Sequence, residues 1–97
     1  MVDFDPHSEK DWPKCAGVYV LYDVSERPIY IGMATNISTR LKYHSDRFWF
    51  RSPIAQWASY IEVTDKKFRS QLEQVMIKFL KNNAVINKKE TETFYTD

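Results

Sequence analysis

The chain has 97 residues and a formal net charge of +1, a length that suits one compact domain. Hydrophobic residues make up 43% and aromatic residues 15%, which excludes global disorder. No apolar run approaches the roughly 18 residues of a membrane-spanning helix, and the acidic N-terminus is unlike a signal peptide. The single cysteine, Cys15, cannot form an internal disulfide, which fits a cytoplasmic protein.

The near-neutral total conceals a segregated charge distribution. Residues 1–30 carry a net charge of −3, residues 31–89 carry +7, and residues 90–97 carry −3. A phosphate-binding face can be built from such a basic middle portion. The ordinary alternative is that lysines solvate helix surfaces, and charge alone does not decide between the two.

Strand patterns begin after a polar lead-in arm, residues 1–14. The β-branched and aromatic run 18–22 predicts a strand, residues 23–28 a turn, and residues 29–31 a second strand. Two strands joined by a short polar loop predict an antiparallel hairpin.

Two helices and a third strand follow the hairpin. Thr35 or Asn36 is expected to cap a helix that ends near Arg47, and residues 57–63 predict the third strand. The second helix is expected to pack an apolar stripe on the sheet, made of Phe68, Leu72, Val75, Met76, Phe79 and Leu80. We therefore expect an α/β domain of the α+β type, over residues 15–89, with a small three-stranded sheet flanked by helices. Residues 90–97 form a charged tail.

Two strings at the predicted hairpin, Gly17-Val18-Tyr19 and Tyr30-Ile31-Gly32, resemble the paired signature of the GIY-YIG nuclease family. Valine replaces isoleucine in the first string, a conservative change in a strand. Each string alone is unspecific, but their order and spacing together are not. The resemblance implies the GIY-YIG nuclease fold.

Further positions match that family. The stretch 30–41 resembles the family's path from its second motif to its catalytic arginine, here Arg40, and His44 follows one helical turn later. Glu73 resembles the metal-binding glutamate and Asn87 the closing asparagine. The resemblance further implies that Tyr19 positions or deprotonates the attacking water, that Tyr30 hydrogen-bonds the phosphate or the water network, and that His44 accepts the proton of Tyr19.

The residue chemistry is compatible with those roles. Arg40 stays protonated at any working pH and can bind a phosphate with two N–H groups. Magnesium commonly takes one or two carboxylates and keeps several waters, so Glu73 alone can anchor Mg²⁺ or Mn²⁺. Without the motif context, a surface salt bridge would explain Arg40 equally well, and pairing with a neighbouring lysine or arginine would explain Glu73.

Other residues have plainer expectations. Gly32 lets the backbone approach substrate or turn into the helix, and Asn87 braces the site or simply occupies a turn. Tyr22 and Tyr43 are expected to be packing residues. Trp49 and Phe50 either stack on an exposed base or cover the first helix. The predicted DNA contacts are the basic residues Lys42, Arg47, Arg51, Lys66, Lys67 and Arg69.

These patterns predict a magnesium-dependent endonuclease that hydrolyses DNA phosphodiester bonds. The alternative is a catalytically silent DNA-binding module of the same fold that acts with a partner, and a plain interaction domain is a weaker one. An additional domain or partner protein is expected to select the substrate. The sequence does not fix the oligomeric state.

Overall fold

The aromatic and β-branched residues after Gly17 form the central strand of an antiparallel sheet. The computed structural model describes residues 1–80. Strand β2 (Gly17–Tyr22) pairs with β3 (Pro28–Ala34) on one side and with β4 (Trp57–Glu62) on the other. The Asp23 carboxylate accepts hydrogen bonds from the backbone N–H groups of Ser25 and Arg27, which closes the β2–β3 turn. The predicted hairpin and third strand are confirmed.

The sheet has four strands where the sequence predicted three. Strand β1 (Val2–Phe4) pairs antiparallel with β4, giving the order β1-β4-β2-β3, and a 3-10 helix (Glu9–Asp11) follows it. Part of the expected lead-in arm is therefore sheet. A three-residue strand with an acid in its middle gives no period-2 signal, and it forms because β4 offers unpaired backbone groups along its outer side.

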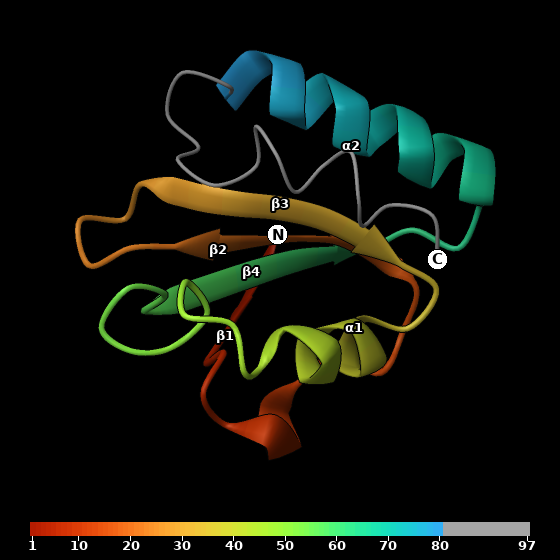
Figure 1. The fold of residues 1–97 in the computed structure, drawn as a ribbon. Helices are drawn as coiled ribbons and strands as arrows, with labels where there is room; N and C mark the ends of the chain where they lie inside the picture. Colours follow the sequence, from red (N-terminus) through yellow and green to blue (C-terminus); the bar gives the residue numbers. More distant parts are fainter. Residues whose placement is uncertain (81–97) are drawn as a thin grey trace.

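The first helix, α1 (Ile37–His44), begins where the sequence predicted. The side chain of Asn36 accepts a hydrogen bond of 3.4 Å from the Thr39 N–H, as expected of an N-cap. Its apolar residues Ile37 and Leu41 are fully buried against the sheet. Helix α1 covers one face of the sheet and α2 (Lys66–Leu80) the other (Figure 1).

Helix α2 packs on the sheet through Leu72 and Met76 as predicted, but its buried side is rotated from the predicted stripe. Phe68 and Val75 are 55% and 64% exposed, so the expectation that they pack on the sheet was wrong. The buried side carries Arg69 and Glu73 beside Leu72, Met76 and Ile77. Hydrophobic periodicity missed this orientation because it cannot foresee that two charged side chains find buried backbone partners, Arg69 just before α2 and Glu73 on β3.

The sheet separates two apolar layers. On the α1 side, the core includes Tyr19, Leu21, Tyr30 and Trp49, whereas Val18, Val20, Ile31 and Met33 face α2. Neighbouring residues of β2 therefore serve different layers, as strand geometry requires. Within residues 1–80, neither helix has the length and hydrophobicity that crossing a bilayer demands.

Candidate active site

Tyr19 and His44 meet inside the molecule, on the α1 side of the sheet. The Tyr19 hydroxyl lies 2.9 Å from Nε2 of His44, and both side chains are fully buried. Tyr19 lies on the central strand and His44 on the last turn of α1, so the packing of α1 on the sheet sets this hydrogen bond. The structure thus joins a strand motif to a helix residue 25 positions later.

Gly32 makes room for the Tyr19 side chain. It pairs with Tyr19 across β2 and β3, and a Cβ built on Gly32 would lie 2.7 Å from both Cζ and the hydroxyl of Tyr19. The same Cβ would lie 2.8 Å from Cε1 of Tyr30. The glycine of the second motif therefore allows both tyrosine rings to lie across β3.

Tyr30 and Trp49 complete an aromatic wall around His44. The Tyr30 and Trp49 rings stack at 4.7 Å with an interplanar angle of 10°, and the His44 ring lies 5.0 Å from each. Tyr30 also stacks on Tyr19 at 6.0 Å. Trp49 is buried, which confirms the packing alternative for this residue and excludes base stacking.

Arg40 is close enough to influence three of the predicted site residues. Burial and the positive charges of Arg40 and Arg47 lower the pKa of His44 to about 3, so its imidazole is neutral near pH 7. Burial, with a further contribution from Tyr30, raises the pKa of Tyr19 well above its usual value, while Arg40 opposes that shift. At neutral pH, the Tyr19 hydroxyl is therefore protonated and can donate to the neutral Nε2 of His44.

Glu73 reaches the same group from the opposite layer. It is 1% exposed on α2, and burial raises its pKa to about 7, against the lowering effects of a hydrogen bond from the Met33 N–H and of the Arg40 charge. Its carboxylate and the Arg40 guanidinium both act on Tyr19 as well. Tyr19, Tyr30, Arg40, His44 and Glu73 are thus brought together from two strands and two helices.

One oxygen of Glu73 is suited to hold a cation. Its Oε1 atom is buried and has no hydrogen-bond partner among residues 1–80, a costly arrangement for a carboxylate that a metal ion would relieve. Within the same residues there is no cluster of three or more His, Cys, Asp or Glu side chains with metal-binding geometry. A hard cation such as Mg²⁺ can be held through one carboxylate and several waters.

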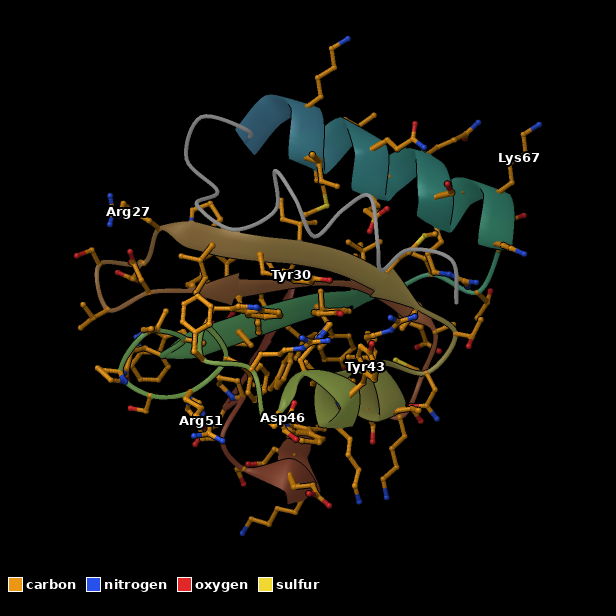
Figure 2. All side chains as sticks on the ribbon, in the orientation of Figure 1. Arg27, Tyr30, Tyr43, Asp46, Arg51 and Lys67 are labelled. Atoms are coloured by element: carbon orange, nitrogen blue, oxygen red, sulfur yellow. The ribbon has the colours of Figure 1, made fainter. Side chains whose placement is uncertain are left out.

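The predicted DNA contacts divide between the two sides of the sheet. Lys42, Arg47 and Arg51 are exposed on or just after α1, while Lys66 and Lys67 are exposed at the start of α2. Figure 2 shows Arg51 and Lys67 on opposite sides of the sheet. The two groups therefore cannot line one straight path on a single face.

Arg69 is not a surface cation. It is buried, and its Nη1 donates hydrogen bonds of 3.0 and 3.4 Å to the carbonyl oxygens of Val63 and Thr64. The expectation that it contacts DNA was wrong, because its guanidinium donates hydrogen bonds to backbone carbonyl groups just before α2. Asn87, the predicted closing asparagine, lies outside the described residues.

The exposure of Tyr43 differs from the expectation drawn from the sequence. This residue was expected to pack, but it is 54% exposed on α1. The guanidinium carbons of Arg40 and Arg47 lie 5.7 and 5.5 Å from the centre of its ring. The spacing of three and four residues between these side chains was the available signal, since it places them on one side of a helix.

Several solved structures of similar fold are of one nuclease domain. The magnesium-bound N-terminal GIY-YIG endonuclease domain of UvrC from Thermotoga maritima matches with a TM-score of 0.62 and 28% sequence identity, over 72% of this chain and 82% of that one. A tyrosine-to-phenylalanine variant of the same domain, also bound to its catalytic divalent cation, matches with the same TM-score at 27% identity. The chain has the fold of a GIY-YIG nuclease domain.

A curated sequence agrees with this GIY-YIG assignment. The UvrABC system protein C of Rickettsia canadensis (strain McKiel) is 52% identical over 31 residues, which are 32% of this chain. The chain spans 5% of the length of that relative. No family model matches the chain. The resemblance inferred from the two tyrosine-glycine strings is thereby confirmed at the level of fold.

Proposed function

We propose that this GIY-YIG domain is a metal-dependent endonuclease that hydrolyses phosphodiester bonds of DNA. The observation that carries the proposal is the buried Tyr19–His44 hydrogen bond, with Arg40 acting on both residues and on Glu73. Hydrolysis of a phosphodiester needs a positioned water, neutralisation of the phosphate charge and stabilisation of the leaving oxygen. The grouped residues supply each of these.

Tyr19 and His44 handle the attacking water. When the Tyr19 hydroxyl donates to Nε2 of His44, its oxygen can accept a hydrogen bond from a water molecule. As that water attacks, its proton passes to Tyr19 while the Tyr19 proton passes to His44. Binding of the anionic phosphate to Arg40 offsets the charge that lowers the pKa of His44, so substrate itself makes His44 a better proton acceptor.

Arg40 holds the scissile phosphate. Its guanidinium is only half-buried, so it can present N–H groups to a substrate while remaining beside His44 and Glu73. A bidentate contact would orient the phosphate for in-line attack and stabilise the charge that develops on it. Tyr30, stacked against Trp49, orients the water or the phosphate with its hydroxyl.

Glu73 anchors the cation, which we propose to be Mg²⁺ or Mn²⁺. Its buried Oε1 fits this role, and the metal-bound Thermotoga domain supports it by similarity. When bound, such a cation would polarise the phosphate and stabilise the leaving oxygen. Glu73 itself contributes a negative charge fixed on α2, close to Arg40, which keeps the cation and the arginine on the same phosphate.

The substrate and setting are part of the proposal. The similarity to UvrC domains favours DNA, and a further domain or a partner protein would select the site that is cut, since the chain spans a small part of its curated relative. The half-buried thiol of Cys15 fits a reducing compartment such as the cytoplasm. Asn87 keeps its predicted bracing role as a proposal.

Plasmid nicking tests the proposal. Supercoiled plasmid is incubated with wild type, Arg40→Ala and Glu73→Gln, in Mg²⁺ and in EDTA. Wild type should give nicked circles only with the metal, and each variant should lose activity by at least about a hundredfold, the scale of one electrostatic contact to a transition state. Equal cutting by all three proteins would reveal a contaminant, and salt-sensitive binding without any product would favour the silent DNA-binding module.

A further inference from the structure

A hollow of about 420 Å³ opens beside Arg40 at α1 and the residues just before it. It is lined by Thr35, Asn36, Thr39, Arg40 and Tyr43. This volume falls within the ~300–1,000 Å³ typical of small-molecule sites. Because Arg40 belongs both to this wall and to the proposed phosphate site, whatever fills the hollow adjoins the phosphate.

The start of α1 does not offer its backbone N–H groups to the hollow. The N–H groups of Ile37 and Ser38 donate to the carbonyl oxygens of Cys15 and Pro13 at 2.9 and 2.8 Å, and that of Thr39 donates to the Asn36 side chain. A second anion bound at the helix N-terminus is therefore disfavoured. The hollow is lined instead by two threonines, one asparagine, one arginine and one tyrosine.

The Tyr43 ring is the apolar part of that wall, and arginines hold it in place. Nη2 of Arg47 approaches the Tyr43 hydroxyl at 3.5 Å, and both guanidiniums lie within 6 Å of the ring centre. An exposed ring between two arginines is a common platform for nucleobases, because rings and guanidinium planes both stack on bases. Figure 2 shows Tyr43 on the same side of the sheet as α1, away from Lys67.

We propose that this hollow binds the nucleoside next to the scissile phosphate, with its base stacked on Tyr43 and its sugar against Thr35 and Thr39. The identity of the phosphate at Arg40 rests on the proposed function. A base paired in a duplex is already stacked, so this domain favours DNA whose base at that position is displaced or single-stranded. The substrate class is then a frayed, looped or flap-bearing phosphodiester rather than continuous duplex.

A double-mutant cycle between protein and DNA tests stacking directly. Fluorescence anisotropy in EDTA measures binding without cleavage, using one labelled single-stranded oligonucleotide with all its bases and one of equal length that carries only the sugar-phosphate backbone. Tyr43→Ala should weaken binding of the intact strand about tenfold, within the range for one stacked base, and leave binding of the base-free strand unchanged. Tyr43→Phe keeps the ring and should bind as wild type does.

Lys42→Ala is the matched control, since Lys42 is an exposed cation two residues from Arg40 and therefore on another side of α1. It should weaken both strands by the same factor. If Tyr43→Ala also weakens both strands equally, the ring only positions Arg47 and the inference is overturned. Absence of binding by wild type overturns it too. If wild type does not nick plasmid but the double-mutant cycle gives the expected result, the nuclease function is refuted and the base-binding site is supported.

Discussion

The Tyr19 hydroxyl and the His44 Nε2 lie 2.9 Å apart, and both side chains are fully buried. The two residues come from different layers of secondary structure, so their distance is fixed by the packing of α1 on β2. Burial keeps both of them uncharged at neutral pH, because it raises the pKa of Tyr19 and lowers that of His44. In the proposed mechanism, proton movement through this pair depends on phosphate binding at Arg40.

Tyr19→Phe should remove activity while leaving the fold intact. The ring keeps its place over Gly32, so the free energy of unfolding should fall by only about 1 kcal/mol, the net worth of one hydrogen bond. The rate of nicking should fall about 10²- to 10⁴-fold, the usual effect of losing a proton-transfer group. Tyr22→Phe is the matched control, because that hydroxyl bonds Ser59 Oγ at 2.8 Å on the α2 face. Similar activity losses in both variants would contradict the role of Tyr19.

His44 should make the protein acid-sensitive. Its pKa falls to about 3 in the folded state, so the stability it confers is fully present above the unfolded value of 6.5 and is lost as pH falls toward 3. Between pH 6.5 and 4.5 this loss is about 2.5 kcal/mol. Glu73 acts in the opposite direction in this interval, because its pKa is raised. Urea titrations of wild type and His44→Gln at several pH values measure the effect. The difference between their unfolding free energies cancels the Glu73 contribution, which both proteins share. A difference that does not change with pH would contradict the burial of a neutral imidazole.

Glu73→Gln should stabilise the metal-free protein at alkaline pH. The folded pKa of about 7 lies above the ordinary 4.5, so wild type loses stability as pH rises through this interval and the glutamine variant does not. In EDTA, the free energy of unfolding of the variant relative to that of wild type should rise by about 3 kcal/mol between pH 4.5 and 8. Adding Mg²⁺ or Mn²⁺ should restore the wild type selectively, since a bound cation stabilises the native state by mass action. Glu62→Gln, at an exposed acid, should show neither effect, and an equal response of all proteins to the metal would argue against a site at Glu73.

Gly32→Ala should damage the site more than the fold. The added methyl group meets Tyr19 and Tyr30 at 2.7 to 2.8 Å, which costs roughly 1–3 kcal/mol and displaces the Tyr19 hydroxyl from His44. Val20→Ala provides a protein of comparable stability, because Val20 is buried in the core layer that faces α2, whereas Tyr19 and Tyr30 lie in the layer on the α1 side. At a temperature where both variants are folded, only Gly32→Ala should lose most nicking activity. Full activity of Gly32→Ala would mean that Tyr19 need not be held so tightly.

Substitutions of Arg47 and Arg69 should affect different properties: the first should change DNA binding and the second the stability of the fold. Arg47→Ala should reduce the dependence of affinity on salt by about one charge, with little effect on stability. Arg69→Met should leave salt dependence unchanged but cost about 1–3 kcal/mol, because the carbonyl oxygens of Val63 and Thr64 lose their buried donor. Anisotropy titrations across salt concentrations and thermal unfolding measure the two effects. A reduced salt dependence in Arg69→Met, with unchanged stability, would instead indicate that Arg69 contacts DNA.

The sequence predicted those features that depend on local chemistry. The hairpin followed from β-branched residues around a polar turn, and α1 from the Asn36 cap, so the positions of Tyr19, Tyr30, Arg40 and His44 relative to these elements could be expected. Features set by long-range packing could not. Strand β1 exists only because β4 accepts it, and the side of α2 that faces the sheet depends on polar contacts made by Arg69 and Glu73.

The same limit applies to the aromatic residues of the site. Trp49 and Tyr43 are both aromatic residues close to His44 in the sequence. Trp49 is nevertheless buried against Tyr30, whereas Tyr43 projects between two arginines. Whether an aromatic side chain packs or binds depends on which neighbours reach it in three dimensions. Their roles therefore became distinguishable only from the arrangement around His44.

The contact between Glu73 and the Met33 N–H bears on how this protein behaves at high concentration. Among residues 1–80, strand β3 forms one edge of the sheet, and outward backbone groups at such an edge can recruit a strand of another molecule and start aggregation. The carboxylate occupies one of these donors, and the opposite edge is the short strand β1 with Asp3 at its centre. An inactive form meant for crystallisation or trapping with DNA is therefore better made as Glu73→Gln than as Glu73→Ala, since the amide oxygen can keep the edge donor engaged.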